Sequence, residues 1–182
     1  VSKNIISISV HSKVFIVWLK ERVLKADHMS RTMLKQQIKH FYDLSSPLFL
    51  ELWGPHIHDG FYVTGKESKE KAQENLITLL AKKAKFRKGH HVLDVGCGMG
   101  GSSIYLSTKF GATTKGITLS PVQVKMATRF AEQKHAHSTF WVMDAEKFQT
   151  DERFDVMWIL GALTHFTKQE DFIKKAHGLL KN

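Results

Sequence analysis

Residues 91–101 read His-Val-Leu-Asp-Val-Gly-Cys-Gly-Met-Gly-Gly, and this stretch decides the fold. The run His91 to Val95 is short, apolar and β-branched, which is typical of a central strand in a parallel sheet. The glycines that follow allow the backbone to turn sharply and to approach a ligand without an intervening Cβ atom. Ser102 to Phe110 then has the pattern of a helix, whose first N–H groups can bind an anion. The stretch therefore predicts a strand, a turn and a helix that hold a nucleotide-like ligand.

Two kinds of cofactor fit this geometry. Gly96, Gly98 and Gly101 have the spacing G-x-G-x-x-G of dinucleotide-binding folds, which would indicate an NAD-dependent oxidoreductase. That function requires an acidic residue at the end of the second strand, expected at 112–117, to bind the ribose hydroxyls. Thr118 stands there instead, so the oxidoreductase remains only as the less favoured alternative.

The fuller motif indicates a different cofactor. The string Leu93 to Gly100 resembles motif I of the class I methyltransferases, which bind S-adenosylmethionine. Gly116 to Gln123 is similar to the second-strand segment of one branch, in which Thr and Gln replace the usual acid. That branch includes the tocopherol methyltransferases, the sterol C-methyltransferases and the cyclopropane fatty acid synthases. Residues 41–46 and 53–62 resemble the leading segment of the tocopherol-type members, and the resemblance extends from about Lys35 to the C-terminus.

The resemblance implies an α/β fold with a Rossmann-like sheet and a helical cover at its N-terminal side. The chain alternates apolar strands with amphipathic helices, as parallel sheets require. We expect strands at 91–95, 112–117, 139–142 and 155–160, and helices at 32–42, within 68–85, and at 102–110, 121–134 and 168–180. The family has seven strands, so we expect an incomplete sheet of about four parallel strands from a C-terminally truncated chain. Its fourth strand, 155–160, would then be an apolar edge open to self-association.

The chain divides into three segments. At 182 residues and 42% hydrophobic content it suffices for one domain. Residues 89–182 form the predicted S-adenosylmethionine-binding domain, and residues 29–88 form the helical cover. We expect residues 1–28 to be an extension, disordered or not native, that does not join the fold. We expect a cytoplasmic location, with an organelle presequence in that extension left open as an alternative.

Composition excludes several other classes of function. The net charge of +10 is spread along the chain without an Arg-rich or aromatic-interleaved stripe, so we expect no nucleic-acid partner. The basic region 66–88 leaves a peripheral membrane contact open, although no run is long enough for a transmembrane segment. Cys97 is the only cysteine, which excludes an intrachain disulfide and a zinc cluster, and we expect no metal.

The resemblance also places the parts of the cofactor. The carboxylate of Asp94 suits the ammonium of the methionine moiety, which Gly96 and Gly98 allow to lie against the backbone. Thr118 and Gln123 stand where ribose contacts are expected, because a hydroxyl and an amide can bind diol hydroxyls in place of a carboxylate.

The adenine is expected beyond the third strand. Asp144 would accept from the adenine amino group and the Ala145 N–H would lie near the ring, while Leu160 and Gly161 would line the methyl-transfer pocket. The predicted cofactor-binding residues are Tyr62, Asp94, Gly96, Cys97, Gly98, Thr118, Leu119, Gln123, Asp144, Ala145 and Leu160.

The predicted catalytic residue is His165. Related members carry a Glu-His pair here, and the glutamate position is Thr164 in this chain, which weakens the inference about acceptor chemistry. A histidine with its ordinary pKa near 6.5 can orient an acceptor or take its proton at neutral pH. The alternative is a solvent-facing histidine in a loop.

The segment from Trp53 to Tyr62 is expected to fold over the cofactor. Tyr62 or Trp53 would lie near the sulfonium, whose positive charge an aromatic face stabilises, and His56 and His58 would face the pocket. The favoured function is methyl transfer from S-adenosylmethionine to a small, apolar or lipid-like acceptor. The alternative from another class is a non-catalytic scaffold module that pairs through its sheet edge.

Overall fold

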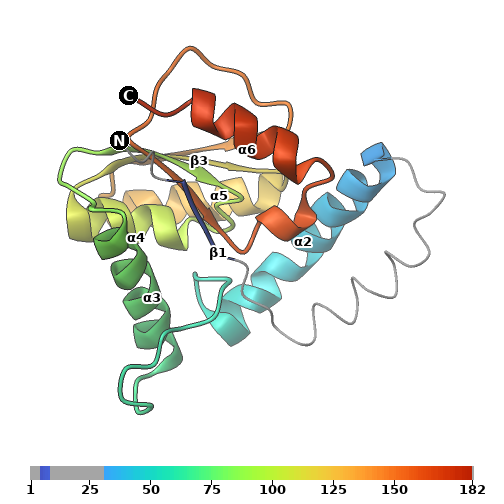
Figure 1. Ribbon diagram of the computed structural model, residues 1–182. Helices are drawn as coiled ribbons and strands as arrows, with labels where there is room; N and C mark the ends of the chain where they lie inside the picture. Colours follow the sequence, from blue (N-terminus) through green and yellow to red (C-terminus); the bar gives the residue numbers. More distant parts are fainter. Residues whose placement is uncertain (1–4, 9–30, 182) are drawn as a thin grey trace.

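A computed structural model of the protein describes residues 5–8 and 31–181 (Figure 1). Its centre is a five-stranded sheet in which every paired neighbour is parallel. The strand order is β1-β5-β2-β3-β4. The bounds are β1 (Ile5–Ile8), β2 (His91–Val95), β3 (Thr113–Thr118), β4 (Ser138–Val142) and β5 (Val156–Leu160). The predicted α/β sheet is thus confirmed, and its four sequence-predicted strands lie within one residue of their expected bounds.

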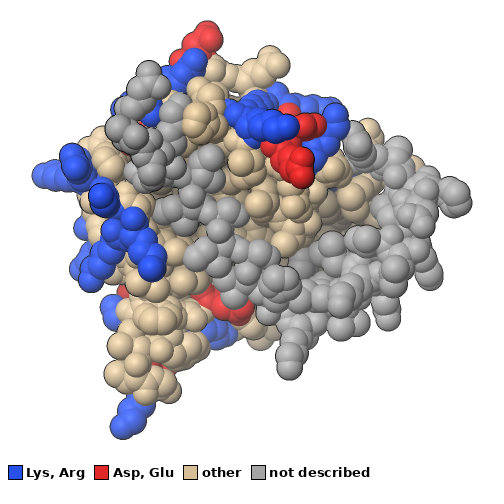
Figure 2. Space-filling view, in the orientation of Figure 1, with Lys and Arg blue, Asp and Glu red and all other residues tan. Residues whose placement is uncertain are grey.

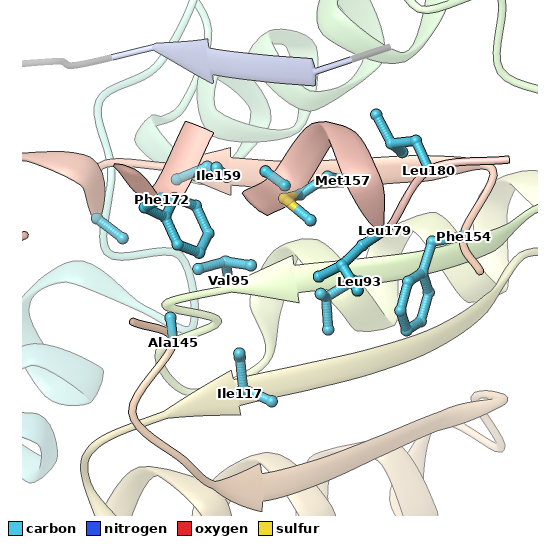
Figure 3. Packing of buried hydrophobic residues seen from close by; sticks show 12 residues of the cluster. Leu93, Val95, Ile117, Ala145, Phe154, Met157, Ile159, Phe172, Leu179 and Leu180 are labelled. Atoms are coloured by element: carbon cyan, nitrogen blue, oxygen red, sulfur yellow. The ribbon is translucent and has the colours of Figure 1, made fainter. Parts of the chain in front are cut away.

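Helices cover the sheet on both faces. Their bounds are α2 (Arg31–Trp53), α3 (Lys69–Lys83), α4 (Gly101–Phe110), α5 (Pro121–Gln133) and α6 (Gln169–Gly178), with a short 3-10 turn η2 (Leu163–His165). Alternate residues of a strand point to opposite faces, so Leu93 and Val95 pack under α6 while Val92 packs under α3 and α4. Figure 3 shows Phe172 of α6 beside Val95, and Leu179, the residue after α6, beside Leu93. Because β2 is buried on both faces, it forms the core of the domain.

The long helix α2 differs from the prediction at its C-terminal end. The predicted helix ends at Tyr42, and Pro47, which lacks a backbone N–H, is a residue that usually interrupts a helix. The structure continues the helix to Trp53 with Pro47 inside it. Ser45 and Ser46 donate from their hydroxyls to the carbonyls of Phe41 and Tyr42, one turn earlier.

The edge of β5 is paired with β1. The register aligns Ile5 with Met157 and Ile8 with Leu160. We expected residues 1–28 to stay outside the fold and β5 to be an open edge, and at Ile5–Ile8 the structure differs from both expectations. The remainder of that segment, 9–30, lies outside the described residues. The scaffold alternative, which relied on an open β5 edge, therefore loses its structural basis.

The charged side chains form separate groups on the surface. Figure 2 shows Lys and Arg gathered over the side of the molecule where α4 lies, and a mixed group of basic and acidic side chains over α6. None of the helices in the described part of the chain is long and apolar enough to cross a membrane.

Replacing Gly100 by alanine is expected to destabilise the fold more than replacing Gly89. Both have a left-handed φ, at +83° and +82°, which costs a side-chain-bearing residue about 1–2 kcal/mol. A Cβ at Gly100 would also lie 2.8 Å from Phe140 Cζ and 2.9 Å from Ala127 Cβ, whereas Gly89 has open space. Overpacking adds about 1–3 kcal/mol for Gly100→Ala alone. Urea denaturation measures the difference, and equal losses in the two variants would contradict the packing argument.

Candidate functional site

The main pocket lies at the carboxyl ends of the parallel strands, beneath α2. Loops that leave β2, β3, β4 and β5 supply its floor, as is usual for ligand sites in open α/β sheets. Nine of the sequence-predicted site residues line it: Gly96, Gly98, Thr118, Leu119, Gln123, Asp144, Ala145, Leu160 and His165. A smaller pocket adjoins it and shares Gly96, Gly98 and Leu160, and this second pocket is lined by Asp94 and Cys97. The structure therefore gathers residues that are far apart in the sequence into one continuous region.

Asp94 is a buried carboxylate without a cationic partner. It ends β2 with only 2% of its surface exposed, and Ser103 Oγ of α4 donates to its Oδ2 atom at 2.7 Å. None of the ion pairs among the described residues involves it. Burial raises the pKa of Asp94 to about 7, against which the Ser103 hydrogen bond acts only in part. A cationic ligand in the smaller pocket would supply the missing charge.

Two histidines face Asp94 across the smaller pocket. Gln73 of α3 fixes their segment, since its Nε2 donates to the carbonyls of His56 at 2.7 Å and His58 at 2.9 Å. His56 Nδ1 and His58 Nε2 are buried and have no hydrogen-bond partner among the residues that the structure describes. Burial, with a smaller contribution from His58, lowers the pKa of His56 to about 3, and burial lowers that of His58 as well. Both rings are therefore neutral at neutral pH and present polar nitrogen atoms to a ligand, as their sequence positions led us to expect.

Thr118 and Gln123 form a hydroxyl–amide pair in the lining of the main pocket. Thr118 Oγ1, at the end of β3, donates to Gln123 Oε1 at 2.7 Å, and both side chains are buried. Ser120 caps α5, because its Oγ accepts from the Gln123 N–H at 3.1 Å, and Pro121 begins the helix. Since Thr118 occupies the amide oxygen, the Gln123 amide nitrogen is the group that can donate to a ligand hydroxyl. The pair can thus contact a ribose hydroxyl through an amide N–H, but it offers no carboxylate of the kind that dinucleotide-binding sheets use.

Asp144 lies in an ion-pair cluster that the sequence did not predict. Lys35 of α2 places its Nζ 2.6 Å from Asp144 Oδ2 and also pairs with the carboxylate of Glu146. Burial alone would lower the pKa of Lys35, but hydrogen bonds to the two carboxylates raise it above its ordinary value. Asp144 Oδ1 accepts from the Glu146 N–H at 3.0 Å. All three residues line the main pocket, so this cluster forms one of its ends.

His165 and Tyr42 also line the main pocket and contact each other. The Tyr42 hydroxyl of α2 lies 3.1 Å from His165 Nε2, and the two rings stand nearly perpendicular. Burial lowers the pKa of His165 to about 4 and raises the pKa of the Tyr42 hydroxyl well above its usual value. Both are therefore neutral at physiological pH, and His165 is not the solvent-facing histidine of the alternative interpretation. Sequence reasoning missed Tyr42, although it lies in the segment 41–46 that carries the resemblance.

Two predicted residues lie away from both pockets, and a third, Cys97, lines the smaller pocket with an unreactive thiol. Tyr62 is 48% exposed and lines neither pocket, so the structure does not bring it to the cofactor region. Trp53 also lines neither pocket; its Nε1 donates to the His58 carbonyl at 3.4 Å, and Lys69 Nζ lies 4.6 Å from its ring centre. Cys97 is buried in the turn, and burial raises the pKa of its thiol well above the usual value, which makes it unreactive. Within the described residues, no group of three or more His, Cys, Asp or Glu side chains could hold a metal ion.

A parallel sheet with a glycine turn after its central strand, and polar groups at the ends of three successive strands, defines the class I methyltransferase fold. Residues 29–182 match the sequence profile of the family described as mycolic acid cyclopropane synthetase, and the chain belongs to this family. The branch indicated by its motifs is thereby confirmed.

Three relatives show the range of the likeness. The tocopherol O-methyltransferase of Arabidopsis thaliana, described as chloroplastic, is 38% identical over 162 residues, which cover 80% of this chain and 46% of that protein. The [4+2]-cyclase SpnF is 30% identical with a TM-score of 0.75, over 81% of this chain and 56% of that chain. Mycolic acid cyclopropane synthase CmaA1, solved with SAH (S-adenosylhomocysteine) and CTAB, is 25% identical with a TM-score of 0.74, over 81% of this chain and 53% of that chain. The chain thus spans about half the length of these relatives. The predicted cofactor, S-adenosylmethionine, agrees with the SAH bound in the CmaA1 structure.

The affinity for S-adenosylhomocysteine is expected to fall as the pH is lowered through 7. Asp94 has a pKa of about 7 without ligand, and an ammonium beside it would lower that pKa, so binding releases a proton below pH 7. The expected slope approaches tenfold in Kd per pH unit between pH 6.5 and 5.5, measured by calorimetry.

Two variants make this assignment to Asp94 specific. Asp94→Asn should bind S-adenosylhomocysteine weakly, with an affinity that does not change with pH over this range. Asp155→Asn is the matched control, because Asp155 is paired with Lys181 at 2.8 Å and lines neither pocket, and it retains the slope. A pH-independent affinity in the unmodified chain would remove Asp94 from the ligand site.

Proposed function

We propose that this chain is the cofactor-binding part of an S-adenosylmethionine-dependent methyltransferase that acts on a small, apolar or lipid-like acceptor. The observation that carries the proposal is the buried Asp94 carboxylate without a cation, at the mouth of the glycine turn. A buried carboxylate fits the ammonium of the cofactor's methionine part. The amide of Gln123 suits the ribose, and the carboxylate of Asp144 suits the adenine amino group. These assignments extend the likeness of the chain to its family by the chemistry of its own side chains.

The same residues fit the task that methyl transfer sets for a protein. When bound, the cofactor supplies a methyl group already activated on a sulfonium, so the protein must align the acceptor and exclude water. Asp94 and Gln123 would hold the methionine and ribose parts of the cofactor, and both residues lie on rigid elements near the ends of β2 and β3. Ile38, Ala162 and Phe166 make the wall near His165 apolar, which excludes water and suits an apolar acceptor.

His165 is placed to receive a proton from the acceptor. Its low pKa keeps the imidazole neutral at physiological pH, which is the form that can accept a proton. The Tyr42 hydroxyl lies within hydrogen-bond distance of Nε2 and holds the ring in one orientation. Thr164 in place of glutamate means that no carboxylate precedes the histidine, so the pair with Tyr42 is the orienting contact in this chain.

The alternatives have less support. An NAD-dependent oxidoreductase requires a carboxylate where Thr118 donates to Gln123, and the scaffold alternative requires the β5 edge that β1 occupies. The Arabidopsis relative is described as chloroplastic, which supports an organelle location over the cytoplasmic location that we expected. A reporter fused to residues 1–28 would distinguish the two locations.

Calorimetric titration of the chain tests the cofactor assignment. We expect saturable binding of S-adenosylhomocysteine and no binding of NAD, because the Thr118–Gln123 pair leaves no carboxylate for the ribose of a dinucleotide. Circular dichroism on the same sample confirms that the chain is folded. A folded chain that binds NAD, or that binds neither ligand, would overturn the proposal.

Replacing His165 by alanine in a full-length form of the protein is expected to separate turnover from cofactor binding. Loss of a general base typically lowers the rate by about 10²–10⁴-fold, whereas the affinity for S-adenosylhomocysteine should stay within about twofold. Tyr42→Phe retains the ring but loses the hydroxyl, and turnover should fall by about tenfold or less. The acceptors to assay are tocopherol-type phenols and other lipid-like compounds. Unchanged turnover in His165→Ala would exclude the base role, and a large loss of affinity would assign His165 to the cofactor site instead.

A further inference from the structure

The cover helix α2 reaches the Asp144 end of the pocket through one charged side chain. Lys35 projects between the carboxylates of Asp144 and Glu146, which lie two residues apart in the loop after β4. The exposed fractions of these side chains are only 18%, 18% and 11%, so the cluster is largely shielded from water. Ion pairs of this kind are stronger than exposed ones but are costly to break from one side, because the remaining charges lose their compensation.

The two carboxylates differ in how they are held. Glu146 also accepts from Thr167 Oγ1 at 3.0 Å and from the Lys168 N–H at 2.6 Å, just before α6. Asp144 accepts from the Glu146 N–H, and among the described residues Lys35 is the only side chain that donates to it. Glu146 is therefore fixed without Lys35, whereas the orientation of Asp144 depends on it.

This difference gives Lys35 a role toward a ligand base. A carboxylate has about four lone-pair positions, so Asp144 keeps acceptor capacity after it has received both bonds. An amino group of a purine could use that capacity only if the carboxylate is turned into the pocket. Without the ammonium, Asp144 and Glu146 would be two shielded like charges close together, and repulsion would turn Asp144 away.

We propose that Lys35 is a positioning residue for the adenine end of the cofactor. This proposal rests on the proposed function. Lys35 fixes the Asp144 carboxylate for the adenine amino group, and the same ion pair holds the N-terminal half of α2 over the base. Binding of the base and closure of α2 are thereby coupled through one side chain.

The test compares three variants of α2 by calorimetry with S-adenosylhomocysteine. Lys35→Met removes the charge but keeps a flexible side chain, and it should weaken binding tenfold or more. Lys35→Arg restores the ion pair and should stay within about threefold of the unmodified chain. Lys39→Met is the matched control, because Lys39 lies one turn further along α2 and pairs with Asp43 at 2.6 Å with 45% of its side chain exposed. It should stay within about twofold.

A double-mutant cycle separates positioning from a general effect on the fold. If Lys35 acts through Asp144, Lys35→Met should change the affinity by less than threefold in an Asp144→Asn background. Amide hydrogen exchange gives a second measurement. Lys35→Met, but not Lys39→Met, should accelerate exchange in residues 31–42. It should also abolish the slowing of exchange in these residues that S-adenosylhomocysteine causes in the unmodified chain.

The outcomes are distinguishable. If the unmodified chain binds no S-adenosylhomocysteine, the proposed function fails, and the positioning role fails with it. If the unmodified chain binds and Lys35→Met binds equally well, the positioning role alone is overturned. The same is true if Lys35→Met weakens binding equally in the presence and absence of the Asp144 carboxylate, because Lys35 would then act by another route.

Discussion

The structure depends on the close packing of the backbone turn that follows β2. The N–H groups of Gly96 and Cys97 both donate to the Ile117 carbonyl, at 2.8 and 3.1 Å, which ties the turn to the end of β3. A Cβ at Gly96 would lie 2.2 Å from Ala162 Cβ, so the chain after β5 passes directly against the turn. This packing brings the ends of three strands to one place. It also directs α4 so that Ser103 donates a hydrogen bond to Asp94. The polar side chains at the strand ends are thereby brought to the two pockets.

The features that the sequence predicted are those with a local cause. Strands β2 to β5 follow from short apolar runs between breakers, and the start of α5 follows from Ser120 and Pro121, whose capping role needs no distant partner. The glycine turn is predictable for the same reason, because its residue types leave few backbone conformations. The resemblance assigned Asp94, Thr118 and Gln123 to the cofactor, and their positions near the ends of β2 and β3 and the start of α5 bring them to the pockets.

The features that were missed depend on contacts between distant segments. Lys35 and Asp144 are 109 residues apart, and Tyr42 and His165 are 123 apart, so no local pattern pairs them. The end of α2 was missed because the segment after Tyr42 was interpreted as irregular, whereas the helix continues through Pro47, a residue that usually interrupts helices. Tyr62 was assigned to the pocket because aromatic faces stabilise cations, and the structure instead brings His56 and His58 of the same segment to the smaller pocket.

The place of Cys97 has a consequence for chemical labelling. The thiol is buried between the strand ends, its Sγ lies 3.6 Å from the Gly98 carbonyl, and its raised pKa keeps it protonated. Thiol reagents react with the thiolate, so a native molecule should be modified only when the turn opens and exposes the sulfur to water. As the chain contains no other cysteine, a single modification rate reports on the opening of the cofactor region, without an engineered label. Cys97, which has no part in the proposed chemistry, can thus report the rate at which the glycine turn opens.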